Sequence, residues 1–198
     1  RLKQGDKIGI VAPAGPVDQK ILKKGLAMLK KMGFSPVLGK HVLAQDRYMA
    51  GTDKQRIEDL HDFFRDPQIK AIFCARGGYG TNRILPSLDS SIIRKNPKIL
   101  VGSSDITLLI LFLVQQCSLV AFHGPMVAGS FGNYSMPKSK LQFSEILLGK
   151  KAGKRLTANE ARVFKSGTAE GKVIGGCLTL LCRSLGTPWE IKTRNKIL

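Results

Sequence analysis

The chain has 198 residues and a formal net charge of +18, from 32 Lys and Arg against 14 Asp and Glu. Its 43% hydrophobic content excludes disorder by composition, and its length fits one full domain, or one domain and the start of another. The basic residues occur singly or in pairs without interleaved aromatic residues. This pattern favours a solvated basic surface over a nucleic-acid site or contact with an acidic membrane or wall polymer, so we expect no nucleic-acid partner.

Apolar runs and cysteine spacing exclude two further classes of protein. The longest apolar run, Ile106 to Val114, is too short to cross a bilayer, so no membrane association is expected. The four cysteines form no Cys-x-x-Cys pair, which argues against zinc and thioredoxin-like sites. We expect free, buried thiols in a reducing compartment, and neither a metal nor a cofactor, at Cys74, Cys117, Cys177 and Cys182.

Strands alternate with amphipathic helices along the first part of the chain. Short apolar runs predict strands at residues 7–12, 34–38, 69–75, 98–102 and 118–122. Helical stripes predict a helix after the cap residue Asp18, one after the cap residue Thr52, a short one near 82–85 and one from Asp105. This alternation predicts an α/β fold with a Rossmann- or flavodoxin-like parallel sheet covered on both faces.

The pattern changes in the last third of the chain. Glycine, asparagine and proline after Ser130 predict a loop, followed by a helix near 139–148 and a basic, weakly periodic stretch. A new helix is expected at 178–185, and a strand begins at Ile197. We predict an N-terminal domain at 1–135, a linker at 136–166 and the incomplete start of a smaller second domain at 167–198.

Three segments follow predicted strands and are therefore expected at one edge of the sheet, where parallel α/β folds place their sites. They are Pro13–Pro16, Arg76–Gly80 and Gly102–Asp105. Asp105 is the only residue with an ionised side chain expected between Lys98 and Lys138. A lone acid in the centre of a fold needs a partner or a role.

Two of these segments carry recognisable chemistry. A serine at a sharp strand-to-helix turn is exposed, and the amide that follows can bind an oxyanion, but Ser104 or Asp105 is also a common helix cap. Glycines 77, 78 and 80 let the backbone approach a ligand; a plain tight turn is the alternative, and the ending of a phosphate loop is missing. His123, at the end of a strand, fits a structural histidine better than a base for the serine.

Together these segments resemble the L,D-carboxypeptidase family, which includes murein tetrapeptide carboxypeptidases and microcin C immunity proteins. The resemblance extends along nearly the whole chain, through GDKIGIVAPAG (5–15), YMAGTD (48–53), Arg56, 59–60, IFCARGGYG (72–80), 88–89, GSSDIT (102–107), FHGP (122–125), GGCL (175–178) and LGTPW (185–189).

The resemblance implies that Ser104 is the nucleophile of a Ser-His-Glu triad. It implies an oxyanion hole made by the amides of Asp105 and of the Gly77–Gly78 loop, without a metal. The implied activity is that of a cytoplasmic serine carboxypeptidase, a hydrolase that removes the terminal D-alanine from murein tetrapeptides during peptidoglycan recycling in the cell wall. The alternatives are a non-catalytic remnant that binds peptides and a microcin C-type peptidase that cleaves a peptidyl nucleotide. Family members are often dimers, so a homodimer is also open.

Two departures from the family pattern stand out. Cys177 lies where many members carry asparagine, which places a polar contact from this position in doubt. The glutamate and histidine of the triad follow the last strand in the family pattern, beyond Leu198. The resemblance therefore implies that this chain is a fragment or a truncated product, and that alone it is inactive.

Overall fold

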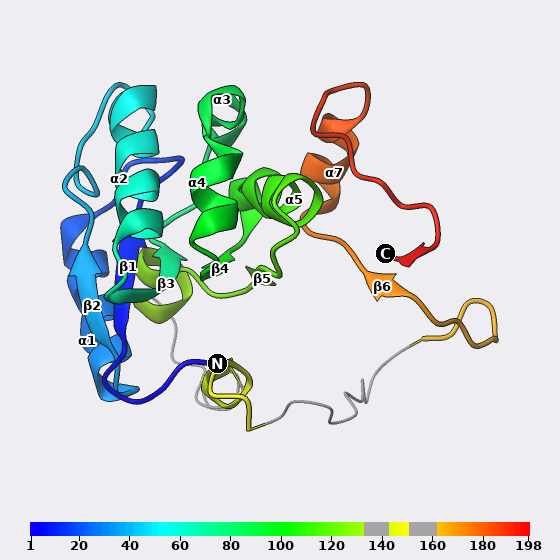
Figure 1. Cartoon of the computed structure of the whole chain (residues 1–198), viewed down its shortest axis with the longest axis horizontal. Helices are drawn as coiled ribbons and strands as arrows, with labels where there is room; N and C mark the ends of the chain where they lie inside the picture. The colour runs from blue at the N-terminus through cyan, green and yellow to red at the C-terminus, as the bar shows by residue number, and fades with distance from the viewer. Residues whose placement is uncertain (133–142, 151–161) are drawn as a thin grey trace.

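A five-stranded parallel sheet forms the centre of the computed structural model, which describes residues 1–132, 143–150 and 162–198. Its strands are β1 (Lys7–Val11), β2 (Ser35–Leu38), β3 (Ile69–Cys74), β4 (Ile99–Gly102) and β5 (Phe122–His123). They lie in the order β2-β1-β3-β4-β5 (Figure 1), and every neighbouring pair is parallel. This confirms the predicted α/β class, and of the two proposed topologies the order is the flavodoxin-like one.

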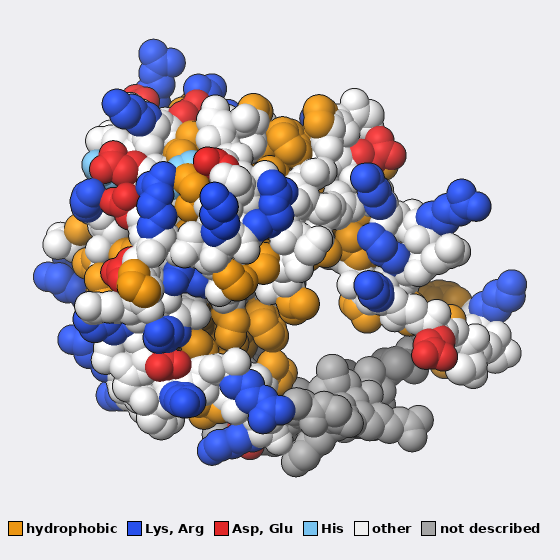
Figure 2. Space-filling model, in the orientation of Figure 1, with side chains coloured by type: hydrophobic (Ala, Val, Ile, Leu, Met, Phe, Trp, Pro, Cys, Tyr) orange, Lys and Arg blue, Asp and Glu red, His pale blue; other side chains and the backbone are white. Residues whose placement is uncertain are grey.

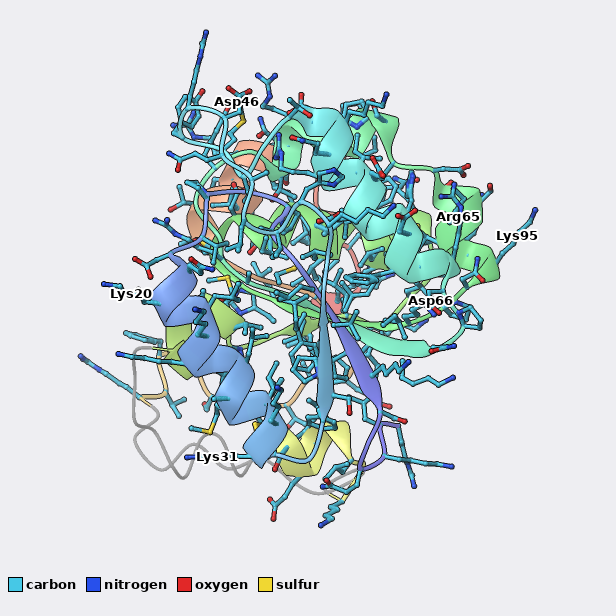
Figure 3. The ribbon with its side chains drawn as sticks, turned by 90° about the vertical axis from the view of Figure 1, so that its left-hand side faces the viewer. Lys20, Lys31, Asp46, Arg65, Asp66 and Lys95 are labelled. Carbon is cyan, nitrogen blue, oxygen red and sulfur yellow. The ribbon has the colours of Figure 1, made fainter. Side chains whose placement is uncertain are left out.

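Helices cover both faces of this sheet (Figures 1 and 3). One face carries α2 (Asp53–Arg65), α3 (Thr81–Ile84), α4 (Ser90–Lys95) and α5 (Thr107–Gln116). The other carries α1 (Gln19–Lys31), the π-helical turn η3 (Val127–Phe131) and a helical stretch at 143–147. In Figure 3, Lys20 and Lys31 mark the two ends of α1, and Arg65 marks the end of α2.

The side chains of β3 show why the strands are buried on both faces. Ile72 and Cys74 belong to the core beneath α2 and α5, whereas Ala71 and Phe73 belong to the core beneath α1. Successive side chains of a strand point to opposite faces, so a strand between two helical layers must be apolar throughout. Apart from the exposed Lys70, the residues of β3 fit this arrangement.

Both predicted helix caps are present. The Asp18 side chain accepts the amide of Ile21 at the start of α1. Thr52 and Gln55 form a reciprocal capping box at the start of α2, where each side chain satisfies a backbone amide. These local bonds fix where the two helices begin.

Three local predictions need correction. Strand β5 is limited to Phe122–His123, and the predicted start of that strand, Ser118, has a left-handed φ of 56°. Helix α4 was not predicted; it is short and buries only Ile93, so it leaves little periodicity in the sequence. The helix expected from Asp105 begins with a 3-10 turn, Ser104–Ile106, before α5.

The described C-terminal residues, 162–198, lie to one side of the sheet (Figure 1). Strands β6 (Lys172–Val173) and β7 (Lys196–Ile197) pair in parallel, and α7 (Leu178–Ser184) packs on α5. The Trp189 ring meets Phe112 of α5 with centroids 5.6 Å apart. The helix predicted at 178–185 is confirmed as α7, which ends one residue earlier.

Other predictions for this part of the chain have mixed outcomes. All four cysteines are free, but only Cys74 and Cys117 are buried; Cys177 is partly buried and Cys182, on α7, is exposed. Of the helix predicted near 139–148, residues 143–147 are helical and 139–142 lie outside the described residues. Most of the predicted linker also lies outside them, so the domain boundaries stay a prediction.

The surface agrees with a diffuse basic character. Lys and Arg are scattered over the face shown in Figure 2, interleaved with acidic and apolar side chains. None of the helices in the described part of the chain combines the length and apolar composition needed to span a bilayer.

Candidate active site

The three segments singled out in the sequence meet at the carboxyl edge of the sheet. The Gly15 amide, after β1, donates to the Gly77 carbonyl, after β3, at 2.9 Å. Arg76 Nη1 donates to the Pro16 carbonyl at 2.7 Å. Strands β1 and β3 are adjacent although the chain passes through β2 between them, so this edge is the switch point at which such folds bind ligands.

Ser104 lies where β4 turns toward α5. It is exposed, and its φ of 57° is left-handed, which is uncommon for a residue other than glycine. Within the described residues neither Ser103 nor Ser104 caps the following helix with its side chain. The capping interpretation of Ser104 is therefore wrong, and its hydroxyl is presented to solvent at a backbone conformation that tends to occur at functional sites.

The glycine loop passes directly against Ser104. A Cβ placed on Gly77 would lie 3.0 Å from Ser104 Cβ and 3.3 Å from its Oγ. A Cβ on Gly78, whose φ is 111°, would lie 3.1 Å from the Cα of Gly15. A side chain at either position would force a neighbouring loop to shift by a few tenths of an ångström, and at Gly78 the positive φ also favours glycine. The Gly78 amide donates to no other described residue.

Asp105 has the partner that its isolated charge required. Its side chain is 3% exposed, and its Oδ2 accepts the amide of Thr81 at 2.8 Å. Thr81 follows the glycine loop directly as the first residue of α3. Asp105 therefore holds the end of the glycine loop against the turn that carries Ser104, rather than capping its own helix.

Arg56 is the residue that sequence reasoning did not place in the site. It is 2% exposed on α2, and its Nη1 donates to the carbonyls of Pro13 (2.7 Å) and Gly80 (2.9 Å). Its Nη2 pairs with Asp53, which also pairs with Arg83. The pKa of Asp53 is held below its usual value, mainly by the hydrogen bond from Arg83 and also by the charge on Arg56.

Arg56, on α2, thus links the loop that begins at Pro13 to the end of the glycine loop at Gly80. A sequence signal for it existed: Arg56 lies four residues before Leu60 and so shares the buried face of α2. An arginine on a buried helical face needs carbonyl or carboxylate partners, and loops beyond the sheet edge supply them.

The three histidines do not complete a catalytic triad within the described residues. His41 Nδ1 lies 3.0 Å from Asp59 Oδ1, and His61 Nε2 accepts the Asp89 amide at 3.1 Å. His123 is exposed beside Gly102 in the sheet and forms no hydrogen bond with a described residue. Burial lowers the pKa of both His61 and His123. No imidazole in the described ranges therefore bonds to Ser104, and the described ranges hold no cluster of three metal-ligating side chains.

A cavity of about 520 Å³, termed here the seam cavity, opens beside the glycine loop between the sheet domain and the C-terminal residues. Its lining comes from both parts: Gly78, Tyr79, Asn82, Asp105 and Leu108 on one side, and Thr179, Leu180, Arg183, Ser184, Thr187 and Trp189 on the other. The volume suits a small peptide or a similar ligand.

Thr107 joins the two sides of this cavity. Its Oγ1, on the first residue of α5, accepts the Cys177 amide at 3.0 Å. A Cβ on Gly176 would lie 2.4 Å from Thr107 Cγ2, so the backbone of the C-terminal part lies directly on the helix that follows Ser104. At Cys177 the backbone makes this contact, and the contact does not depend on the side chain.

Comparison with known proteins matches both parts of the chain to one family. Residues 8–124 match the LD-carboxypeptidase N-terminal domain, and residues 170–198 match the LD-carboxypeptidase C-terminal domain. The chain is 42% identical over 198 residues to the probable murein peptide carboxypeptidase of Bacillus subtilis (strain 168), covering 100% of this chain and 62% of that protein. It is 37% identical over 190 residues to the murein tetrapeptide carboxypeptidase of Pseudomonas aeruginosa, covering 91% of this chain and 61% of that protein.

A third similar protein is named for a different role. The microcin C7 self-immunity protein MccF of Escherichia coli is 31% identical over 218 aligned positions, covering 95% of this chain and 63% of that protein. A solved structure of an MccF variant in complex with adenosine monophosphate superposes with a TM-score of 0.86 at 29% identity, covering 100% of this chain and 68% of that one. The chain thus spans about three fifths of the length of the curated relatives it matches.

Proposed function

Because this chain belongs to the LD-carboxypeptidase family, a family of peptidases, we propose that it supplies the nucleophile of a serine-type hydrolase. The substrate proposed is a murein tetrapeptide, from which the enzyme removes the terminal D-alanine across an L,D bond. One observation carries the proposal. Ser104 is exposed at a left-handed strand-to-helix turn, with Gly77 packed against its side chain. The Gly78 amide, next along the loop, has no hydrogen-bond partner among the described residues.

In the proposed reaction, Ser104 Oγ attacks the carbonyl carbon of the L,D bond. The amides of Asp105 and of the Gly77–Gly78 loop stabilise the negative oxygen of the tetrahedral intermediate. A histidine takes the Ser104 proton during the attack and gives it to the D-alanine amine as the C–N bond breaks. The same base then activates water, which hydrolyses the acyl-enzyme and returns the proton to Ser104. We assign this histidine, and the glutamate that orients it, to the part of the relatives' length that this chain does not span.

We also propose the domain boundaries that the sequence predicted. Residues 1–135 carry the nucleophile, 136–166 link the domains and 167–198 begin the second domain that would bring the base. Action in the cytoplasm on recycled wall peptides, and a homodimeric assembly, stay predictions from the family resemblance.

A second candidate function has one observation in its favour. A structure of MccF with adenosine monophosphate aligns over the whole of this chain, and that protein is named for self-immunity to microcin C7. A peptidase of that type would use Ser104 in the same way but cleave a peptidyl nucleotide. A third candidate, a peptide-binding remnant without catalysis, is favoured by the lack of a histidine bonded to Ser104 within the described residues.

The test joins the chain to the part of the Bacillus subtilis relative that extends past the matched region. We expect this chimera to release D-alanine from a murein tetrapeptide faster than it cleaves a peptidyl adenylate. Ser104→Ala should lower the rate by at least about 10³-fold while circular dichroism stays unchanged. Ser118→Ala is the matched control, because Ser118 is also exposed with a φ of 56°. Near-normal turnover by Ser104→Ala would rule out the serine mechanism.

A further inference from the structure

The seam cavity contains a single unpaired positive charge. Two charged side chains line it, Asp105 and Arg183. The Asp105 carboxylate is buried and bonded to the Thr81 amide. Arg183, on the last turn of α7, is exposed and forms neither a hydrogen bond nor an ion pair with any described residue.

Neighbouring charges do not neutralise Arg183. The acid nearest to it in the C-terminal sequence, Glu190, accepts the Gly186 amide through its Oε2 at 2.7 Å. Arg83, on α3 beyond the glycine loop, shows the contrast: its Nη2 lies 3.0 Å from Asp53 Oδ2, so its guanidinium already has an acidic partner. Arg183 therefore offers its five N–H donors to whatever occupies the cavity.

The other residues that line the seam cavity indicate what kind of ligand would fit it. Leu108, Leu180 and Trp189 form an apolar wall, and Trp189 is held in place by its contact with Phe112. Asn82 and Thr179 add polar groups from opposite sides. Apolar surface with a few polar groups suits the aliphatic stem and amides of a short peptide better than a bare ion.

We propose that Arg183 is a specificity-determining residue that binds a carboxylate of a peptide held in the seam cavity, and so selects acidic peptides. A guanidinium and a carboxylate match in shape and form two parallel charge-assisted hydrogen bonds. The peptide class rests on the proposed function, since a murein tetrapeptide carries a carboxylate at its C-terminal D-alanine and others within the chain. The net charge of +18 would add a general attraction for such a peptide.

Binding can be measured on the 198-residue chain itself by titration calorimetry, so the test does not depend on turnover. We expect Arg183→Gln to weaken tetrapeptide binding by about tenfold, which corresponds to about 1.4 kcal/mol, and Arg183→Lys by less. Arg194→Gln removes the same charge from an exposed site in the same segment, outside the cavity lining, and should change affinity less than about twofold. No binding by the unaltered chain, or equal losses in Arg183→Gln and Arg194→Gln, would overturn the proposal.

Peptides with one carboxylate replaced by a carboxamide identify the group that Arg183 binds. The loss caused by Arg183→Gln should disappear for one amidated peptide and persist for the others. Persistence for every amidated peptide, or an Arg183 dependence seen with adenosine monophosphate but not with tetrapeptide, would refute carboxylate recognition. An active Ser104→Ala chimera would defeat the proposed function but leave this binding result standing.

Discussion

The sheet domain and the C-terminal residues 162–198 are held together by different means. The sheet domain encloses two apolar cores, one on each face of its strands. The C-terminal part has no such core within its described residues: Ile174, Leu181 and Ile191 join the core around α5, while Val173, Leu178 and Leu198 are exposed. Its backbone is fastened through Thr107 and through Gln115, which bonds to Glu190 and Lys192.

This difference separates two tasks at the candidate site. The well-packed sheet domain carries Ser104 and the glycine loop, which lie in close contact. The part that depends on α5 supplies Arg183 and most of the opposite wall of the seam cavity. In the proposed reaction, attack on the carbonyl would depend on the sheet domain, and the choice of peptide would depend on the C-terminal part.

The largest effect is expected from the part of the relatives that this chain does not span. The 198-residue chain alone should cleave a murein tetrapeptide at least about 10³-fold more slowly than the chimera, because a hydroxyl without an adjacent base is a weak nucleophile. The assay compares D-alanine release by the two proteins at equal concentration. Equal rates would place the base within this chain and would make His123 the first residue to test.

Gly77→Ala tests the close contact between the glycine loop and Ser104 in the sheet domain. The added methyl would lie 3.0 Å from Ser104 Cβ, so the serine or the loop must shift, and we expect kcat/KM of the chimera to fall about 10- to 100-fold. The free energy of unfolding should change by about 1 kcal/mol or less. Gly175→Ala is the matched control, because a Cβ there meets no atom within 4 Å. Equal effects of the two substitutions would mean that crowding of Ser104 is not the cause.

Thr107→Val tests the attachment of the C-terminal part. The valine removes the acceptor of the Cys177 amide and leaves that partly buried donor unpaired, at a cost of about 1–2 kcal/mol. Hydrogen exchange should therefore become faster in α7 and β6 and stay unchanged in β1 and β3. Thr193→Val, at an exposed threonine of the same segment, should leave both unchanged. Uniformly faster exchange would show that the two parts open together.

The smallest expected effect is a loss of folding stability at acidic pH. Burial holds the folded pKa of His61 below 6.5, and its Nε2 accepts the Asp89 amide, a bond that needs the neutral ring. A lowered histidine pKa gives stability that is present above about pH 6.5 and is lost as the pH falls from there through the folded pKa. Urea unfolding should show lower stability at pH 5 than at pH 7, with a shallower pH slope in His61→Gln. An unchanged slope would contradict this assignment.

The sheet domain was largely predictable because its signals are local. Apolar runs, the caps Asp18 and Thr52, and the turn at Gly102–Asp105 each depend on neighbouring residues, and the meeting of loops at one edge follows from parallel strands. The hydrogen bonds of Arg56 and the lining of the seam cavity both involve segments that are far apart in sequence. Arg56 reaches Pro13 and Gly80, and no spacing along the chain states that these carbonyls converge.

In the C-terminal part, the sequence predicted a helix and a strand at Ile197, and the structure has α7 and β7 there, but the packing of α7 was not predicted. Its apolar face indicated that α7 packs on something, but the choice of α5 follows from the hydrogen bond between Thr107 and Cys177 and from the Trp189–Phe112 contact. Cys182 was expected to be buried because it follows an apolar run; in fact it lies on the outward side of α7. A short amphipathic helix does not reveal which of its flanks its partner will cover.

The close contact among the three loops also constrains laboratory evolution of this scaffold. Gly15, Gly77 and Gly78 lie in close contact, so a side chain at any of them would displace a neighbouring loop and disturb the position of Ser104. The opposite wall of the cavity is formed by side chains on α7 and the turn after it, where Thr179, Arg183 and Thr187 are exposed. A library aimed at new peptide preferences should therefore vary these three codons and leave the three glycines fixed.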